Sequence, residues 1–182
     1  EYCRWGSATP VNPVSLKNAV LYFAYGSNMS PQRLLQRVPS AVVVGVAILP
    51  GHRLAFHKVG RDGSAKCDAT LTNAATDRVH GVIYRIDAWH KPRLDAKEGL
   101  GCGYEQKTVE VKLHDHGRSS AFLYYATHVD ASLKPFTWYR EHVLHGARAH
   151  ALPEHYIAAI HAVDAVDDPD PQRHRLEMAI YG

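Results

Sequence analysis

Short strand-like segments separated by turn signals fill most of residues 20–127, and this pattern limits the fold more than any other feature of the sequence. β-Branched and aromatic residues between Gly, Pro, Asn and Asp indicate strands at 20–25, 41–49, 53–59, 68–72, 79–86, 104–113 and 119–127. Capping residues and apolar spacing predict helices at 30–38, 91–98, 135–150 and 153–162. This order predicts an α+β fold in which helices lie outside a curved or closed mixed sheet.

Size and composition fit one domain. The chain has 182 residues, and single cores usually contain ~100–200 residues. No segment approaches the ~20 apolar residues needed to span a bilayer, so we expect no membrane partner. The formal charge is +3 and the basic residues are scattered, so we expect no nucleic-acid partner either.

The three cysteines, Cys3, Cys67 and Cys102, lack CxxC spacing, which argues against both a disulfide framework and a zinc ribbon. A reducing, cytoplasmic location is therefore expected. Residues 1–18 contain two prolines and no sustained apolar run, so no signal peptide is indicated there. We interpret residues 1–18 as a tail, 19–163 as the folded domain and 164–182 as a C-terminal extension.

The turn Tyr25-Gly26-Ser27-Asn28 joins the first strand to a helix that begins near Ser30-Pro31. Glycine allows the backbone to approach a ligand closely, and the amides that enter a helix carry partial positive charge. Such a turn can bind a carboxylate or a developing oxyanion. The same four residues are also compatible with a plain turn between a strand and a helix.

Glu98 is the second candidate, because it lies in the last turn of a helix predicted to end at Gly99. The helix dipole disfavours a carboxylate anion at that position and favours its protonated form. Glu98 is therefore a candidate acid/base. Alternatively, it is a solvated residue beside Lys97, as most glutamates are.

Several segments fall in a characteristic order along the chain. They are Leu21 to Asn28, Val79 to Tyr84, Leu94 to Gly99 with Tyr104, Tyr124, and His145-Gly146-Ala147 before Leu152-Pro153. In this order they resemble the γ-glutamylcyclotransferase family, as a bacterial-type member, over about residues 20–162. The form Ala24-Tyr25-Gly26-Ser27-Asn28 looks closer to this branch than to the related glutathione-specific group.

The resemblance implies a small mixed or antiparallel β-barrel with flanking helices and an enzyme that acts on a small γ-glutamyl molecule. The reaction would convert a γ-glutamyl amino acid or amine to 5-oxoproline and a free amine, with Glu98 as general acid/base. The implied substrate contacts are Tyr22, Phe23, Ala24, Tyr25, Gly26, Ser27, Asn28, Tyr104 and Tyr124, with Tyr125 as an alternative to Tyr124. No cofactor or metal is implied, and we expect a monomer or homodimer.

The chemistry itself needs few groups. The substrate's α-ammonium must lose a proton before it can attack, which a neighbouring carboxylate can accept. Ring closure is intramolecular, so effective molarities of ~10⁵ M or more make an enzyme nucleophile unnecessary.

Two other functions remain open. One is a non-catalytic domain that binds γ-glutamyl groups or small carboxylates. The other is an amidohydrolase with Cys102 as nucleophile, although the nearby Glu98 would make that thiol less nucleophilic.

Two further groups of residues attract attention. A metal site is suggested by several polar residues, namely His114, Asp115, His116, His142, His145 and His150. His142 and His145 would share one helix face, but the sequence offers no carboxylate or third ligand with matching spacing to complete a site. Loop 58–66 carries Lys58, Arg61 and Lys66, which could face a carboxylate or phosphate on the leaving part of the substrate. Alternatively, the loop is a solvated hairpin tip.

Overall fold

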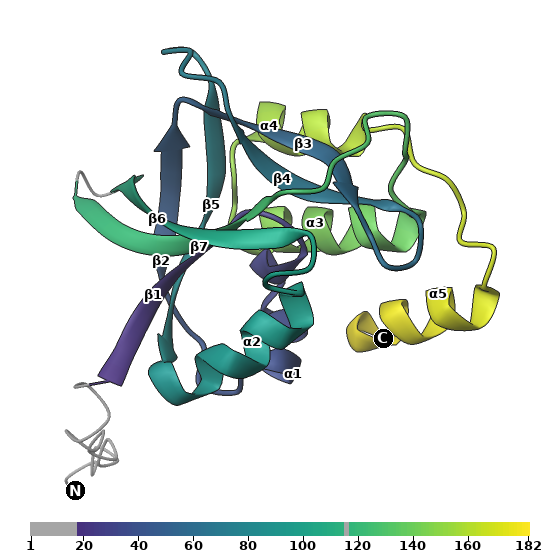
Figure 1. Ribbon diagram of the computed structural model, residues 1–182, viewed down its shortest axis with the longest axis horizontal. Coiled ribbons are helices and arrows are strands. Elements are labelled where there is room, and N and C mark those ends of the chain that lie inside the picture. The colour runs from purple at the N-terminus through teal and green to yellow at the C-terminus, as the bar shows by residue number, and fades with distance from the viewer. Residues whose placement is uncertain (1–17, 115–116) are drawn as a thin grey trace, which may run out of the picture.

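A closed five-stranded β-barrel forms the centre of the computed structural model, which describes residues 18–114 and 117–182 (Figure 1). Around the barrel the strands follow the order β1 (Ala19–Ala24), β5 (Arg78–Asp87), β2 (Val42–Pro50), β6 (Tyr104–Leu113) and β7 (Arg118–Ala126). β1 closes the barrel, because it pairs antiparallel with β5 and parallel with β7. The expected α+β barrel is confirmed. The predicted tail, up to residue 17, and the turn residues 115–116 lie outside the described residues.

β3 (His52–Val59) and β4 (Ala65–Leu71) form a separate two-stranded antiparallel sheet. β2 leads into β3 through Gly51, which adopts the left-handed φ of 67° that favours glycine. β4 begins at Ala65, three residues before the predicted start, because Ala65 pairs with Val59 and its side chain is buried. The expected loop 58–66 is thus reduced to a short tip, residues 60–64, between the two strands.

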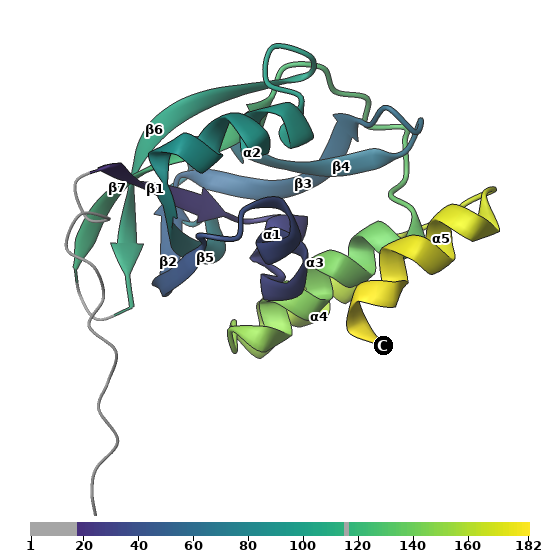
Figure 2. The ribbon, with the colours of Figure 1, turned by 90° about the horizontal axis from the view of Figure 1, so that it is seen from below.

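The helices lie outside the barrel (Figure 2). They are the 3-10 turn η2 (Ser27–Met29), α1 (Pro31–Arg37), η3 (Ala88–His90), α2 (Lys91–Glu98), α3 (Thr137–Ala149), α4 (Glu154–His161), α5 (Pro171–Met178) and η4 (Ala179–Tyr181). Ser30 caps α1 by accepting from the Arg33 amide, and Gly99 ends α2 with a left-handed φ of 73°. Both ends are where the sequence predicts them. Within the described part of the chain, no helix is long and apolar enough to cross a membrane.

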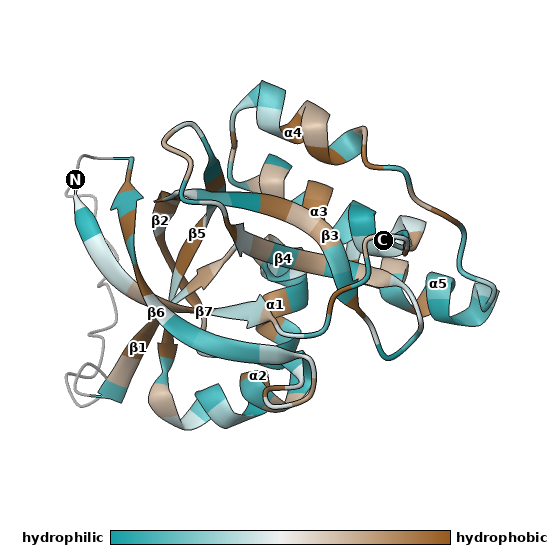
Figure 3. Ribbon diagram, turned by 45° about the horizontal axis from the view of Figure 1, so that its top comes forward, coloured by the Kyte–Doolittle hydropathy of each residue, from teal (hydrophilic) through white to brown (hydrophobic). Residues whose placement is uncertain are grey.

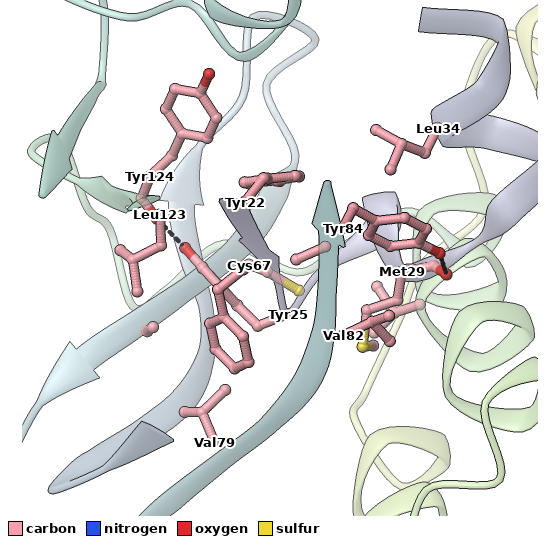
Figure 4. Close-up of a cluster of buried hydrophobic side chains, with 14 of the residues drawn as sticks. Tyr22, Tyr25, Met29, Leu34, Cys67, Val79, Val82, Tyr84, Leu123 and Tyr124 are labelled. Carbon is pink, nitrogen blue, oxygen red and sulfur yellow. Dashed lines mark hydrogen bonds between the residues drawn. The ribbon is translucent and has the colours of Figure 1, made fainter. Parts of the chain in front are cut away.

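Buried apolar side chains form the core of the barrel, and the brown parts of β2 and β5 in Figure 3 mark strongly hydrophobic residues. Phe23, Ile83 and Leu123 are fully buried there. Buried tyrosines lie among them and use their hydroxyls to satisfy backbone carbonyls, for example Tyr84 donating to the Met29 carbonyl at 2.9 Å (Figure 4). These hydrogen bonds fix the orientation of the buried tyrosine rings.

The C-terminal residues pack back onto the domain. Trp138 on α3 donates to the buried carboxylate of Asp168 at 2.7 Å, and Asp170 caps α5 through the amides of Gln172 and Arg173. On α5, Glu177 pairs with Arg33 of α1. The C-terminal extension expected over residues 164–182 therefore contains a helix, α5, that the sequence analysis did not predict.

α3 approaches the turn after β1 very closely. A Cβ atom built on Gly146 would lie 2.5 Å from both the Met29 Cβ and the Ser30 amide nitrogen. Neither neighbour is the flexible end of a side chain, so the backbone would have to move. Gly146 thus sets the position of η2, which carries Ser27 and Asn28.

We expect Gly146→Ala to lower the free energy of unfolding by about 1–3 kcal/mol, because the added methyl group overpacks this contact. Alanine would otherwise stabilise a helix by up to about 1 kcal/mol relative to glycine, so a loss would be diagnostic. Gly45→Ala is the matched control, since its Cβ would meet only Leu113 at 3.5 Å. Thermal and urea unfolding measure both, and an unchanged midpoint for Gly146→Ala would contradict the close contact.

Candidate active site

A recess lies where β1 runs into η2, and residues from several separate parts of the chain line it. It is lined by Tyr22, Tyr25, Gly26, Ser27, Asn28, Cys67, Glu98, Tyr104, Tyr124 and Tyr139. These residues belong to β1, β4, α2, β6, β7 and α3 and to the turn that continues into η2. Figure 4 shows Tyr22, Tyr25, Cys67 and Tyr124 at this place. The two strongest sequence signals, the Gly26 turn and Glu98, therefore meet.

Glu98 is the carboxylate of the recess, and its side chain is only 15% exposed. Its Oε1 accepts hydrogen bonds from Asn28 Nδ2 at 2.9 Å and from Arg37 Nη1 at 2.8 Å. Arg37 also donates to Asn28 Oδ1 at 2.9 Å, which closes a triangle of three side chains. No described residue is bonded to Oε2, so this oxygen is left to contact a bound molecule.

Arg37 changes the electrostatic argument made from the helix dipole. The dipole at the end of α2 disfavours the Glu98 anion, but the guanidinium of Arg37 is a full opposite charge in direct contact and favours it. The sequence-based expectation considered the dipole alone. A contact between residues 61 positions apart has no local signal in the sequence.

Asn28 and Tyr22 connect Glu98 to the barrel. The second hydrogen of Asn28 Nδ2 is donated to the Tyr22 hydroxyl at 3.0 Å. Burial raises the pKa of Tyr22 far above its ordinary value, and the negative charge of Glu98 raises it further. Tyr22 therefore stays neutral and keeps a hydroxyl hydrogen to donate into the recess.

Most of the other tyrosine hydroxyls bind the protein itself. Tyr104 donates to the Cys67 carbonyl, while Tyr139 accepts from the Cys67 amide at 3.0 Å. Tyr25 donates to the Tyr124 carbonyl, and Tyr124 donates to Asp95 on α2. These bonds hold the wall of the recess in one shape. In each of the four, burial raises the pKa well above that of free tyrosine.

Two of the residues predicted to contact substrate lie elsewhere. The side chains of Phe23 and Ala24 are fully buried in the core and do not line the recess. Phe23 packs against Gly81, where a Cβ atom would lie 2.7 Å from the ring. Tyr124 lines the recess, whereas Tyr125 is the next residue along the strand and its ring lies 5.2 Å from Lys107 Nζ.

Three lining or supporting residues, Arg37, Cys67 and Tyr139, were not predicted from the sequence. Cys67 is buried, and burial raises the pKa of its thiol to about 12. Cys102, the cysteine considered as a nucleophile, is exposed and lines neither this recess nor the hollow beside it. Apart from position in the fold, nothing distinguishes Cys67 or Tyr139 from other core residues.

The turn amides are partly committed to local structure. The Met29 amide donates to the Gly26 carbonyl at 2.9 Å and the Ser30 amide to the Ser27 carbonyl at 3.2 Å. The amides of Ser27 and Asn28 have no such bond within the described residues. These two amides remain as candidates for binding an anion or oxyanion.

The recess opens outward into a second hollow that shares Ser27, Glu98, Tyr104 and Tyr139 with it. The cations of this outer hollow are Arg33, Arg37, Lys58, Arg61, Lys66 and Lys97, against the carboxylates of Asp62 and Glu98. The outer hollow is therefore strongly basic.

Two of the histidines singled out in the sequence, His142 and His145, pack against neighbouring side chains. His142 is fully buried beside Glu177 and Tyr181, and burial lowers its pKa to about 4. His145 stacks on the Tyr181 ring at 3.7 Å. Among residues 18–114 and 117–182, no three His, Cys, Asp or Glu side chains are grouped to hold a metal ion.

Comparisons with known proteins agree on one family. A profile of the AIG2-like family matches residues 78–160. The γ-glutamylcyclotransferase of Mus musculus is 30% identical over 148 residues, covering 79% of this chain and 78% of the relative. That of Bos taurus is 30% identical over 151 residues, covering 81% and 80%.

A solved structure of a γ-glutamyl cyclotransferase superposes with a TM-score of 0.75 at 26% identity, covering 84% of this chain and 92% of that one. Sequence similarity extends over about four-fifths of both chains, and the shared fold includes the barrel that builds the recess. The chain therefore belongs to the γ-glutamylcyclotransferase family.

Proposed function

We propose that this protein is a γ-glutamylcyclotransferase that converts a γ-glutamyl amino acid or amine to 5-oxoproline and a free amine. The observation that carries the proposal is the Glu98 carboxylate, held by Asn28 and Arg37 through one oxygen in a tyrosine-lined recess, with its other oxygen unbonded by described residues. The names of the mouse and bovine relatives support the same activity.

In the proposed mechanism, Glu98 Oε2 takes a proton from the α-ammonium of the γ-glutamyl group. The freed amine then attacks the γ-carbonyl carbon and closes a five-membered ring. The C–N bond to the leaving group breaks as that nitrogen is protonated. Of the three protons on the α-ammonium, one stays on the lactam nitrogen and two reach the leaving amine, with Glu98 as carrier.

The other groups of the recess are proposed to orient the substrate and to stabilise the tetrahedral intermediate. The amides of Ser27 and Asn28 are proposed to bind the oxyanion of the tetrahedral intermediate, because preorganised donors act most strongly on charge that develops in the transition state. The neutral Tyr22 hydroxyl can bind the substrate without competing for its proton. Since attack is intramolecular, proximity supplies most of what a nucleophilic side chain would otherwise provide.

We expect Glu98→Gln to lower kcat by at least ~10², with little change in KM, because glutamine keeps the shape and the acceptor for Arg37 but carries no proton. Release of 5-oxoproline from γ-glutamyl substrates measures this. Glu105→Gln is the matched control, since Glu105 is exposed on β6 outside the recess. A near-wild-type kcat in Glu98→Gln would refute the mechanism. Absence of turnover in the wild-type protein, with tight substrate binding, would instead indicate a non-catalytic binding domain.

The cysteine amidohydrolase is the second candidate, because Cys67 lines the recess. Its raised pKa of about 12 keeps the thiol protonated near neutral pH, however, and the thiolate is the nucleophile. We expect both Cys67→Ala and Cys102→Ala to retain kcat within a few-fold. Intact mass spectrometry during turnover provides the direct measurement, and a γ-glutamyl adduct on either cysteine would overturn the intramolecular route.

We also expect activity to be independent of metal ions, since the proposed steps need only a carboxylate, amides and the substrate's own amine. The measurement is the rate of 5-oxoproline release after prolonged chelation and dialysis. Loss of activity that a divalent ion restores would contradict this scheme.

A further inference from the structure

Some cations that line the outer hollow pair with carboxylates of the described part of the chain, and others do not. Arg37 pairs with Glu98, Lys66 with Asp62 and Arg33 with Glu177. Lys58, Arg61 and Lys97 have no such pair within the described residues, although they line the same hollow. The space beyond Glu98 is therefore bordered by cations whose charge the protein itself leaves unneutralised.

Lys58 is the most unusual of these cations, because only 5% of its surface is exposed. Its Nζ lies 4.5 Å from the centre of the Tyr104 ring, and no described residue accepts a hydrogen bond from it. Burying an ammonium without a paired anion is costly. Burial lowers the pKa of Lys58. The negative charge of Glu98 acts in the opposite direction and raises that pKa. Contact with one aromatic face compensates this cost only in part.

Arg61 lies on the same side of Glu98. Its Nη2 is 3.3 Å from the position that a Cβ on Gly99 would occupy, directly after Glu98 in the chain. Arg61 is exposed, and it comes from the tip between β3 and β4. One buried and one exposed cation thus stand at the outer edge of the recess.

Lys66, the third cation of the loop, has a structural role instead. Its Nζ donates to Asp62 Oδ2 and Ser64 Oγ, both at 2.7 Å, and lies 4.6 Å from the Trp138 ring centre. It is therefore saturated by its own loop and α3. The sequence analysis allowed all three loop cations to face the leaving part of the substrate, and the structure separates Lys66 from the other two.

We propose that Lys58 and Arg61 form an anion subsite, which binds a carboxylate or similar anion carried by the leaving amine. This subsite makes the enzyme selective for substrates whose leaving part carries such an anion. The inference rests on the proposed function, in which the inner recess holds the γ-glutamyl group beside Glu98. The leaving nitrogen is then near Glu98, and the group it carries extends into the outer hollow. A carboxylate there meets Lys58, whereas an uncharged amide or alkyl group leaves that ammonium unpaired.

The test compares two substrates of nearly equal shape, γ-glutamylalanine and γ-glutamylalaninamide, which differ in the charge of the leaving part. We expect wild-type kcat/KM to be at least ~10-fold higher for the carboxylate, as a charge-assisted hydrogen bond would give. In Lys58→Met this ratio should approach one, mainly through KM. Arg61→Gln, at an exposed position that should not affect folding, should reduce the ratio several-fold.

Lys107→Met is the matched control. Lys107 is also a partly buried lysine over a tyrosine ring, at 5.2 Å from the centre of Tyr125, but it lines neither the recess nor the outer hollow. Its substitution should leave the ratio unchanged. Equal wild-type kcat/KM for the two substrates, or an equal loss for both in Lys58→Met, would overturn the anion subsite.

A third substrate, γ-glutamylphosphoethanolamine, tells which anion fits. A preference that equals that for the carboxylate would support a general anion subsite, and rejection would restrict it to carboxylates. Calorimetric binding of the first two compounds to the Glu98→Gln protein separates this inference from the proposed function. Carboxylate-selective binding without wild-type turnover would refute the activity alone, whereas turnover without selectivity would refute the subsite alone.

Stability gives an independent readout. If Lys58 is kept for a ligand, Lys58→Met should have a higher Tm than the wild type, because it removes a buried charge without a protein partner. γ-Glutamylalanine should raise the Tm of the wild type more than that of Lys58→Met, since ligand binding to the folded state stabilises it. A lower Tm for Lys58→Met with unchanged substrate selectivity would assign Lys58 to the fold and overturn the proposal.

Discussion

The contact of Glu98 with Arg37 and Asn28 is the constraint on which the arrangement of the site depends. It ties the end of α2 to the end of α1 and to the turn after β1, although Glu98 lies 61 and 70 residues further along the chain than Arg37 and Asn28. The turn is also held from outside, since Gly146 lets α3 pack closely against it, and Gly99 ends α2 directly after Glu98. The carboxylate is thus fixed by backbone packing as well as by its hydrogen bonds.

Local signals in the sequence predicted the ends of these elements well. Ser30 and Pro31 mark the start of α1 because a capping hydroxyl and a fixed φ act within one helical turn, and Gly99 marks the end of α2 for a similar reason. Asp170 and Pro171 form the same pair of a capping side chain and a first-turn proline at the start of α5, so this pair also predicts a helix there. Motif order, more than any single residue, led to the family.

Contacts between distant segments were not predictable in this way. Closure of the barrel depends on β1 lying beside β7, and the partner of Glu98 is a residue on another helix. Neither contact leaves a periodic pattern in one sequence. The dipole argument for Glu98 was incomplete for this reason, and so was the treatment of the loop cations, because burial and pairing distinguish Lys58 from Lys66 only once the fold is known.

The buried tyrosines of the inner recess have a consequence for how its charge can change. Burial raises the pKa of Tyr22, Tyr25, Tyr104, Tyr124 and Tyr139, and also that of the Cys67 thiol, so all six groups stay uncharged well into the alkaline range. Among the described residues that line the inner recess, Glu98 is the only one with a carboxyl side chain, and none has a cationic one. In the proposed reaction, a proton that leaves the substrate would therefore have a single carboxylate among these lining side chains to accept it, because the tyrosine and cysteine side chains around it stay neutral.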